Sequence, residues 1–486
     1  MADVPVPRAE LTAGQAVAPA VADTAPSVPG PSLPGPSVPG PVLDLLERLW
    51  SAGHAAYVVG GSLRDVLIGR DPYDWDLTTD ARPDRVQALF PGAVYENRFG
   101  TVAVRHGGID YEITTFRSDH EYADHRRPHR VEFGDSIEVD LARRDFTVNA
   151  MAWGAEAPAG AAIGPARPEG RLVDPFGGAA DVRAGILRAV GDPDRRFGED
   201  ALRMIRAVRL AAGVGFAIEP STFAAIRRQA HLVVHLSGER IAAELERLLQ
   251  AARPSVGLRL MESSGLLAVV APDLARQRGL LQNKIAGEDL WDHTMRAVDA
   301  PAADRPVVRL AALLHDIGKP ATETADGYPD HDKVGADMAE ALLARLHLPR
   351  STIARVGHLV RNHMFSYEDA WSDAAVRRFI NRIGPDALDE LFALREADNA
   401  GSGLPPGAGL IELRRRVAEQ LEAHVALTLR DLAINGDDLI RELGLQPGPG
   451  LGRLLESLLE RVIADSTRNQ RATLLLLAQS LQVDEA

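Results

Sequence analysis

The chain has 486 residues, of which 45% are hydrophobic and 25% charged, with no cysteine and a formal net charge of −14. This length allows about three domains with cores of their own. The sequence excludes disulfides and thiolate metal sites, fits a reducing cytoplasm, and lacks any apolar run near the ~18 residues of a membrane span. We therefore expect a cytoplasmic protein without a membrane partner. The negative net charge argues against bulk binding of nucleic acid but does not exclude a local basic surface.

Residues 1–40 contain nine prolines and no periodic apolar pattern. Such a stretch cannot bury enough apolar surface to offset its ordering entropy, so we predict a disordered tail. It also lacks the basic residues and apolar block of a signal peptide. From Pro41, apolar residues recur at helical spacing as far as Trp50, which predicts an amphipathic helix packed on a sheet.

A glycine pair, Gly60-Gly61, separates a predicted strand from a short predicted helix. A glycine turn at a helix N-terminus presents free backbone N–H groups and a positive dipole end, which suit a triphosphate. Arg64, on the same helix, adds a fork of guanidinium donors. We therefore predict that Gly60, Gly61 and Arg64 bind phosphates.

Asp74 and Asp76 follow on what we predict is the next strand. The strand period of two places both carboxylates on one face, and hard oxygen ligands are what Mg²⁺ requires when it also binds substrate phosphates. The plain alternative is an acidic turn beside an ordinary glycine loop. The two features in this order, about ten residues apart, favour a catalytic site.

These motifs resemble the nucleotidyltransferase superfamily of DNA polymerase β, and more narrowly its class II branch of bacterial CCA-adding tRNA nucleotidyltransferases and poly(A) polymerases. The resemblance implies that Asp74 and Asp76 hold Mg²⁺. Superfamily members often place a third carboxylate on a later strand. Here Glu112 lies in a predicted hairpin of strands 101–105 and 111–116, and it either supports the metal site or forms a plain salt bridge.

Residues 117–130 are polar and include three histidines, His120, His125 and His129. Their spacing is irregular and no ordered flanks are predicted, so a mobile loop near RNA or triphosphate is favoured over a metal site. The following segment, Arg143 to Ala150, resembles the second motif of the family. The resemblance implies that Arg144 contacts the nucleotide, whereas a solvated basic helix start is the plain alternative.

The segment from Glu199 to Arg209 combines an apolar stripe with charged residues at helical spacing. Asp200 and Arg203 are three apart and could form an intrahelical salt bridge. The family resemblance implies instead that they pair with the incoming base, because a carboxylate accepts from the exocyclic amine of cytosine or adenine. Arg206 and Arg209 continue the basic ladder toward phosphate or base. Residues 237–245 resemble the last motif, which supports this helix.

Beyond Trp291 the pattern becomes helical and rich in histidine. The adjacent pair His315-Asp316 after an apolar run resembles an HD domain, which binds one or two divalent metals. We predict a metal site from His293, His315, Asp316, His331, His363 and Asp398. His358 is close enough to His363 to compete for that position. Imidazoles with few carboxylates suit Mn²⁺, Ni²⁺ or Co²⁺ better than Mg²⁺.

The fold we expect is α+β: a small mixed-sheet nucleotidyltransferase head, then an all-helical neck, HD domain and tail. We assign residues 1–40 to the disordered tail, 41–190 to the head, 191–275 to the neck, 276–400 to the HD domain and 401–486 to a linker and helical tail. In the tail, 410–432 and 452–482 read as helices that either grip tRNA or form a dimer surface.

The expected function is addition of C, C and A to tRNA from CTP and ATP, with a phosphohydrolase activity of the HD domain beside it. Three alternatives remain open from the sequence. One is a poly(A) polymerase, another adds only CC or only A, and the third is an HD phosphohydrolase whose head binds RNA.

Overall fold

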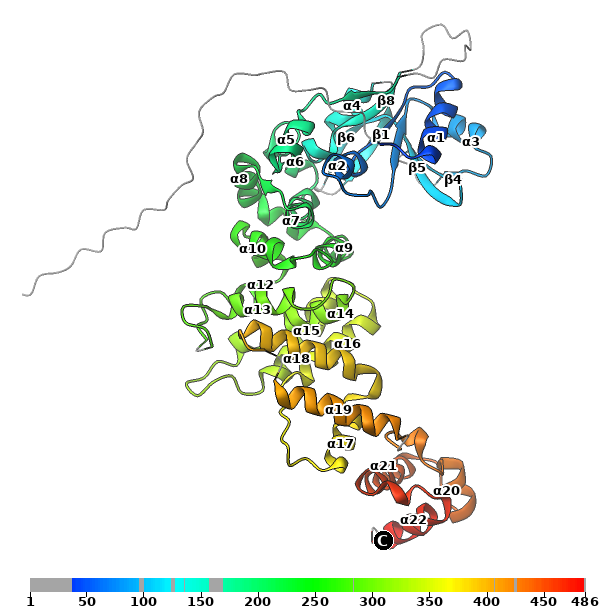
Figure 1. The fold of residues 1–486 in the computed structure, drawn as a ribbon, viewed down its shortest axis with the longest axis vertical. Coiled ribbons are helices and arrows are strands. Elements are labelled where there is room, and N and C mark those ends of the chain that lie inside the picture. Colours follow the sequence, from blue (N-terminus) through cyan, green and yellow to red (C-terminus); the bar gives the residue numbers. More distant parts are fainter. Residues whose placement is uncertain are drawn as a thin grey trace, which may run out of the picture. The chain divides into compact units, whose positions relative to one another are not determined.

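The computed structural model describes residues 37–95, 100–123, 127–134, 136–156, 169–282, 284–405, 407–423 and 426–484. The predicted tail, apart from its last residues, therefore lies outside the described residues. Among the described helices, none combines the length and the apolar character that crossing a membrane would require. The expected α+β fold is confirmed, with a sheet-containing head and a helical body (Figure 1).

The head is built on a seven-stranded sheet of order β3-β4-β5-β2-β1-β8-β9. Only β2 and β5 run parallel within it. The strands are β1 (Ala56–Val59), β2 (Asp76–Thr79), β3 (Val94–Tyr95), β4 (Thr101–His106), β5 (Ile109–Thr115), β8 (Ala152–Ala155) and β9 (Arg171–Val173).

Helix α1 (Gly40–Ser51) is the amphipathic helix predicted from Pro41, and it packs on this sheet with α3 (Pro83–Leu89) beside it. Its apolar stripe is buried, and the Trp50 indole N–H donates to the carbonyl oxygens of both Ala56 (3.1 Å) and Ala155 (3.2 Å). One side chain thereby fastens the helix to β1 and β8, because each of these carbonyls belongs to a different strand.

The glycine turn forms as predicted. Gly60 has φ +82°, which an L side chain rarely adopts, and α2 (Gly61–Leu67) starts at the next residue. The prediction that both aspartates lie on the next strand is only half correct. Strand β2 begins at Asp76, where pairing with β1 and β5 begins, so Asp74 lies in the segment before it.

Residues 117–130 were expected as a loop, but their described part forms strands. Strand β6 (Arg117–Ala123) pairs antiparallel with β7 (Arg127–Phe133), and Arg117 lies opposite Phe133. The hydrogen bonds between the two strands pair their backbone N–H and C=O groups. A strand can therefore form even where the sequence shows no apolar alternation. Of the three histidines, His125 lies outside the described residues. A mobile segment at that position, near RNA or triphosphate, stays a prediction.

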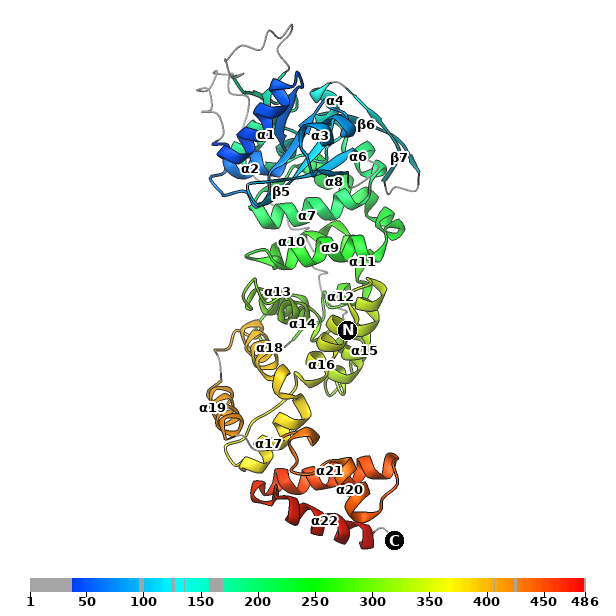
Figure 2. The same cartoon turned by 90° about the vertical axis from the view of Figure 1, so that its right-hand side faces the viewer.

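The neck is helical except for one short parallel pair, β10 (Ile186–Leu187) with β11 (Ala217–Ile218). Helices α7, α9 and α10 lie side by side (Figure 2). The predicted apolar stripe of α7 is core, since Leu202, Ile205 and Val208 are all buried. The helices of the later part of the head and of the neck are α4 (Ile137–Ala142), α5 (Gly178–Ala184), α6 (Pro193–Glu199), α7 (Leu202–Val214), α8 (Pro220–Gln229), α9 (Gly238–Leu249), α10 (Pro254–Ser264), α11 (Leu266–Val270) and α12 (Pro272–Ala275).

The remaining body is helical, and α15 and α16 pack side by side. Its helices are α13 (Leu290–Asp299), α14 (Pro306–Leu314), α15 (His331–Arg345), α16 (Arg350–Asn362), α17 (Asp373–Ile383), α18 (Leu388–Gly401), α19 (Ala408–Glu422), α20 (Gly436–Leu443), α21 (Pro449–Ala464) and α22 (Arg471–Asp484). The tail thus has four helices where two longer ones were expected. Helix α20 begins after Asn435, between the two predicted ranges, and the range 452–482 is divided by a 3-10 turn, Ser466–Arg468.

The described residues form three hydrophobic cores, of which the third is a small one in the head around Tyr57 and Phe116. The first runs from Val42 in α1 to Leu427 and includes head, neck and body. The second belongs to the tail alone and runs from Ala426 to Ala478, with Leu439, Leu458 and Leu474 fully buried. The predicted boundaries at residues 190, 275 and 400 stay predictions.

Candidate functional site

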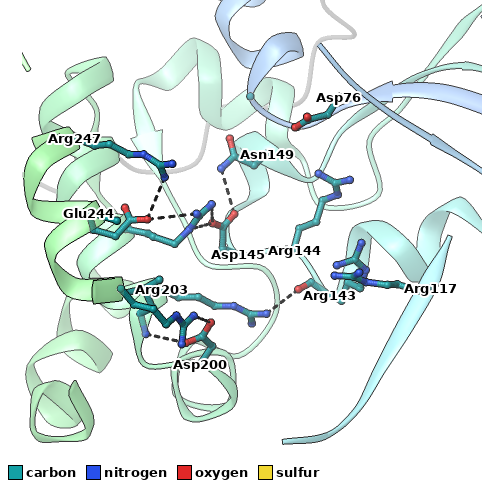
Figure 3. Close-up of a pocket in the computed structure, with 16 residues that line it drawn as sticks. Asp76, Arg117, Arg143, Arg144, Asp145, Asn149, Asp200, Arg203, Glu244 and Arg247 are labelled. Carbon is teal, nitrogen blue, oxygen red and sulfur yellow. Dashed lines mark hydrogen bonds and ion pairs between the residues drawn. The ribbon is translucent and has the colours of Figure 1, made fainter. Parts of the chain in front are cut away.

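A cavity of about 600 Å³ opens between the glycine turn of the head and helices α7 and α9 (Figure 3). It brings together most of the residues predicted to bind nucleotide, together with several buried partners. Its lining residues are Gly60, Gly61, Asp76, Arg117, Arg143, Arg144, Asp145, Asn149, Asp200, Leu202, Arg203, Arg206, Arg240, Ala243, Glu244 and Arg247.

The glycine turn lies close to both the Asp76 carboxylate and the Arg144 guanidinium. A Cβ at Gly60 would lie 3.2 Å from Nη1 of Arg144 and 3.7 Å from Oδ2 of Asp76. Any side chain here would therefore fill the space between the turn and these two side chains. The glycine is needed both for its positive φ and for this close approach.

Asp76 is half-buried and its pKa is raised, first by burial and then by the negative charge of Asp74, while Arg144 acts in the opposite direction. Asp74 itself is exposed and does not line the cavity. Two nearby carboxylates that repel each other are stabilised by a divalent cation between them. The chemistry of this donor set therefore fits Mg²⁺.

Glu112 occupies the position next to Asp76 in the sheet, because the register of the parallel pair β2–β5 places the two residues opposite each other. The sequence left its role open between the metal site and a plain salt bridge. Adjacent strands in parallel register present paired residues on one face, so the carboxylate is on the side of Asp76.

Arg64 binds two side chains of the head. Its Nη1 donates to Oδ1 of Asn149 (2.7 Å), and its Nε and Nη2 donate to Oδ1 of Asp65 (2.9 and 2.8 Å). The guanidinium is buried and does not line the cavity wall. The expected phosphate contact of this side chain stays a prediction, and its observed contacts brace α2 against the segment of Asn149.

Arg143 and Arg144 do not open a helix, as the sequence suggested; they follow one. Helix α4 ends at Ala142, and a 3-10 turn, Thr147–Asn149, begins after Phe146. The turn between them points Arg144 toward Gly60 and Asp76. After Arg144 the chain forms only this one tight turn.

Asp200 and Arg203 both line the cavity, but they do not pair with each other. Oδ2 of Asp200 accepts from Arg240 (2.7 Å) and its Oδ1 caps α7 by accepting from the Leu202 amide (3.1 Å). Arg203 donates to Oε2 of Glu199 (2.9 Å) and to the Arg143 carbonyl (3.1 Å). The intrahelical salt bridge considered as the plain alternative is therefore absent from the contacts that the structure gives these two residues.

Arg206 and Arg209 belong to a chain of buried ion pairs across the cavity floor. Arg206 contacts Asp145 (2.8 Å) and Glu244 (3.7 Å), and Nε of Arg209 donates to Oε2 of Glu244 (2.5 Å). Arg209 does not line the cavity. Burial alone would raise the pKa of Asp145, but the charge and hydrogen bonds of Arg206 lower it to about 2.

Sequence reasoning missed Asp145 and Glu244 as members of this site. Asp145 lies inside the segment that resembles the second motif, and Glu244 lies inside the one that resembles the last. Their place within these motifs could have identified both residues. The sequence could not show that each acid serves the arginines of another helix. Such pairing between segments depends on the packing of α7 against α9.

A second polar centre lies in the helical body, where all six predicted metal ligands come together. The side chains form two groups of three, His293 with His315 and Asp398, and Asp316 with His331 and His363. Within each group the ligand atoms lie within 4.8 Å of one another. His358 is outside both groups, since its Nε2 hydrogen-bonds the Ile383 carbonyl (2.8 Å).

Asp316 connects the two groups. Its Oδ2 is 3.2 Å from Nε2 of His315 and 3.5 Å from Nε2 of His293, whereas its Oδ1 is 3.4 Å from His331 and 3.6 Å from His363. The two oxygens of one carboxylate thus face different sets of imidazoles. Asp316 could therefore contribute a ligand oxygen to either group.

The histidines keep lone pairs available. Nε2 of His331 and of His363 is buried without a hydrogen-bond partner, and burial lowers the pKa of His363 and of His293. Nδ1 of His331 and of His363 hydrogen-bonds a backbone carbonyl, which fixes each ring. Ring nitrogens left without a partner in this way fit a divalent transition metal. The pKa of His315 is shifted in the opposite direction, because burial lowers it but the charge of Asp316 raises it overall.

Three cations surround the same centre. Nζ of Lys319 lies 2.6 Å from Oδ2 of Asp316, Nη1 of Arg395 lies 2.9 Å from Oδ2 of Asp398, and Nζ of Lys284 lies 3.7 Å from Oδ1 of Asp398. Both carboxylates are therefore neutralised in part by side chains that could also contact an anionic substrate.

Comparisons with known proteins agree on one family. A "Poly A polymerase head domain" model matches residues 56–188, a model of the "Probable RNA and SrmB-binding site of polymerase A" matches 215–278, and a model of "tRNA nucleotidyltransferase domain 2" matches 332–478. The chain is 33% identical to a CCA-adding enzyme of Geobacillus stearothermophilus over 431 residues, 88% of this chain and 94% of the relative.

The chain is also 42% identical to a CCA-adding enzyme of Anoxybacillus flavithermus over 439 residues, 89% of this chain and 94% of the relative. Among solved structures, it is similar to the crystal structure of the Bacillus stearothermophilus CCA-adding enzyme in complex with CTP. The TM-score is 0.69 at 30% identity, over 92% of this chain and 98% of that one.

Proposed function

The chain belongs to the CCA-adding enzymes, the class II tRNA nucleotidyltransferases with a poly(A)-polymerase-type head, and we propose that the residues of its cavity divide this reaction as follows. The enzyme adds C, C and A to the 3′ end of tRNA from CTP and ATP without a nucleic-acid template. In each step the terminal 3′ oxygen forms a bond to the α-phosphorus, and the bond to pyrophosphate breaks.

Asp74 and Asp76 would hold Mg²⁺. When bound, the metal supplies charge stabilisation and activation of the attacking hydroxyl. The raised pKa of Asp76, caused by burial and by Asp74, supports this role because both carboxylates gain from a shared cation. Gly60, Gly61 and Arg144 would hold the triphosphate against these carboxylates.

Asp200 and Arg203 would select the base. The carboxylate would accept from the exocyclic amine that cytosine and adenine carry, and the guanidinium would donate to ring acceptors. The fixed hydrogen bonds of both side chains to Arg240, Glu199 and the Arg143 carbonyl support this role. A rigid pair discriminates better than a mobile one, because it cannot rearrange to suit guanine or uracil.

The observation that carries this proposal is the single cavity. The glycine turn, Asp76 and Arg144 from the head line it together with Asp200 and Arg203 from the neck. Phosphate, metal and base ligands thereby lie around one space of about 600 Å³, which is in the range of small-molecule sites.

The decisive experiment incubates the purified chain with a tRNA that lacks its last three nucleotides, with CTP and ATP separately and together. We expect two additions from CTP alone and three from both nucleotides. A long adenosine product from ATP on any RNA would instead support a poly(A) polymerase, which the matched head model keeps as the second candidate. Addition of CC only, or of A only, would identify a partial enzyme.

The helical centre is the basis of a second proposed activity, phosphohydrolysis by an HD-type site. His293, His315, Asp316, His331, His363 and Asp398 would hold Mn²⁺, Ni²⁺ or Co²⁺, which would supply a Lewis acid for the hydrolysis of a phosphate ester. The orphan nitrogens of His331 and His363 support metal binding, and Lys284, Lys319 and Arg395 would offset the charge of the phosphate. Hydrolysis of a terminal or 2′,3′-cyclic phosphate would leave a free hydroxyl for the head.

Wild-type protein loaded with each of these metals tests the second activity on a phosphomonoester and on a 2′,3′-cyclic nucleotide. We expect metal-dependent hydrolysis of at least one of them. If neither is cleaved with any of the three metals, the helical centre serves as scaffold and the proposal of a phosphohydrolase is wrong.

A further inference from the structure

Asp140, near the end of α4, is fully buried and accepts hydrogen bonds from three arginines that line the cavity. Its Oδ1 accepts from Nε (3.0 Å) and Nη2 (2.7 Å) of Arg143 and from the backbone amide of Arg117 (3.4 Å). Its Oδ2 accepts from Nη2 of Arg144 (3.2 Å). One carboxylate thus fixes two guanidinium groups and the start of β6.

The burial of Asp140 separates it from ordinary pairs of this spacing. Exposed ion pairs three or four residues apart on a helix are worth only a few tenths of a kcal/mol. The hydrogen bonds within such exposed pairs are also readily replaced by hydrogen bonds to water. Asp140 has no exposed surface, so its charge depends on Arg143 and Arg144, which lower its pKa although burial alone would raise it. A buried charge that lost these partners would be strongly unfavourable, which makes the arrangement rigid.

The two arginines face different parts of the nucleotide site. Arg144 lies against Gly60 and Asp76, where the triphosphate is expected. The backbone of Arg143 contacts the side of the cavity where the base is expected, because its carbonyl accepts from Nη2 of Arg203 (3.1 Å). The neighbouring carbonyl, that of Ala142, accepts from Nη2 of Arg196 (2.7 Å). The last turn of α4 therefore meets the phosphate side and the base side of the cavity at once.

We propose that Asp140 is a positioning residue for nucleotide binding: it holds Arg144 in place for the triphosphate and fixes the turn at Arg143 on which Arg203 depends. The inference rests on the proposed nucleotide site and assigns no contact between Asp140 and the substrate. Arg144 keeps Nη1 toward Gly60, and both residues line the cavity, so this end of the guanidinium remains available to a phosphate oxygen.

The test replaces Asp140→Asn, which keeps the shape of the side chain but removes its charge and adds an N–H group that faces guanidinium donors. The affinities for CTP, ATP and inorganic pyrophosphate are measured by calorimetry without tRNA. We expect all three dissociation constants to rise about tenfold, as for the loss of one charge-assisted hydrogen bond. The KM for tRNA should stay unchanged. Since pyrophosphate has no base, its weaker binding reports on Arg144 alone.

A matched control separates positioning from general destabilisation. Asp181 is a buried carboxylate that pairs with Arg188 and Thr147 but does not line the cavity. Asp181→Asn should lower the melting temperature without changing the dissociation constant of pyrophosphate. Equal weakening of pyrophosphate binding in both variants would overturn the inference, and so would wild-type affinity of Asp140→Asn.

Asp140→Glu keeps the test decisive if Asp140→Asn does not fold. The glutamate retains the charge but carries one more methylene, so it shifts both arginines. We expect pyrophosphate to bind about threefold more weakly than to wild type. Full affinity would show that the charge alone matters and would contradict a positioning role. Absence of CTP binding to wild-type protein would instead refute the proposed nucleotide site itself.

Discussion

The two polar centres of the molecule are built on opposite principles. The cavity of the head and neck is lined by seven arginines and four carboxylates, and most of these charges already bind one another. The centre of the helical body is built from four histidines and two aspartates, and three of its imidazole nitrogens have no hydrogen-bond partner. The first arrangement has an excess of positive charge for a polyanion, and the second offers lone pairs to a cation.

The comparison shows that the kind of ligand a site binds decides whether its polar groups can already be paired with one another. An anion can be received by arginines that exchange or share their carboxylate partners, so a cavity for it can be fully paired when empty. A metal needs lone pairs that nothing else uses, so its site shows orphaned acceptors. The predictions below test this contrast, from the largest expected effect to the smallest.

The largest effect should come from the carboxylates of the head. Asp76→Asn, and likewise Asp74→Asn, should lower the rate of nucleotide addition by about 10³-fold or more, because the variant loses a ligand of the metal that stabilises the developing charge. Incorporation of labelled CTP into truncated tRNA measures the rate. Asp80→Asn is the matched control, since Asp80 follows the same strand but pairs with His54. Near-normal activity of Asp76→Asn would remove the assigned metal site.

The second prediction concerns the helical centre. The double change His315→Ala and Asp316→Ala should abolish binding of Mn²⁺, Ni²⁺ or Co²⁺, because it removes His315 from one group and, from the other, Asp316, whose carboxylate lies near both groups. Metal content after dialysis, measured by mass spectrometry, gives the result, and CCA addition should remain within about twofold of wild type. His358→Ala, outside the cluster, should keep its metal. Loss of CCA addition in the double variant would show that the two centres are not independent.

Asp145 provides a pH-dependent prediction. Because Arg206 lowers its folded-state pKa to about 2, below the ordinary 3.8, its ion pair stabilises the fold above pH 3.8 and this contribution is lost as the pH falls toward 2. Asp145→Asn should therefore unfold about 2 kcal/mol more easily than wild type at pH 7. Urea titrations at several pH values should show the difference shrinking in acid. A difference that stays constant down to pH 2 would contradict the ion pair.

The smallest effect should be on base selection. Asp200→Ala and Arg203→Ala should each reduce discrimination against UTP and GTP by about 1–3 kcal/mol, the worth of one base-edge pairing. Competition among all four nucleotides, read as relative incorporation, measures this ratio. Arg228→Ala is the control for Arg203, because Arg228 forms an exposed pair with Asp194. Unchanged selectivity in both test variants would leave the two residues with a structural role only.

The sequence was informative where the chemistry is local. The glycine turn, α1, the apolar stripe of α7 and the six ligands of the helical centre follow from spacing and from motifs a few residues long. The ligand cluster could be predicted from residue types alone, because helices that pack together bring such residues to one place between them. His358 shows the limit of that approach. It lies five residues from His363, and only its hydrogen bond to Ile383 excludes it.

The sequence was least informative where a side chain chooses between partners. Arg64 was predicted to bind phosphate, and the sequence did not show that it also binds Asp65 and Asn149. Asp200 and Arg203 were weighed as partners, yet Asp200 binds Arg240, and Arg203 binds Glu199 and the Arg143 carbonyl. Guanidinium groups have several donors and long stems, so their partners depend on tertiary packing that spacing along one helix does not contain.

The separate core of the tail has a consequence for cooperativity. Residues 426–478 bury Leu439, Leu458 and Leu474 among themselves, while the first core ends at Leu427. A segment with its own buried surface unfolds as its own unit when it is weaker than the rest. Heating should therefore melt the protein in two steps. A lesion such as Leu458→Ala should lower only the step that belongs to the tail and leave nucleotide binding at the other end of the chain unaffected.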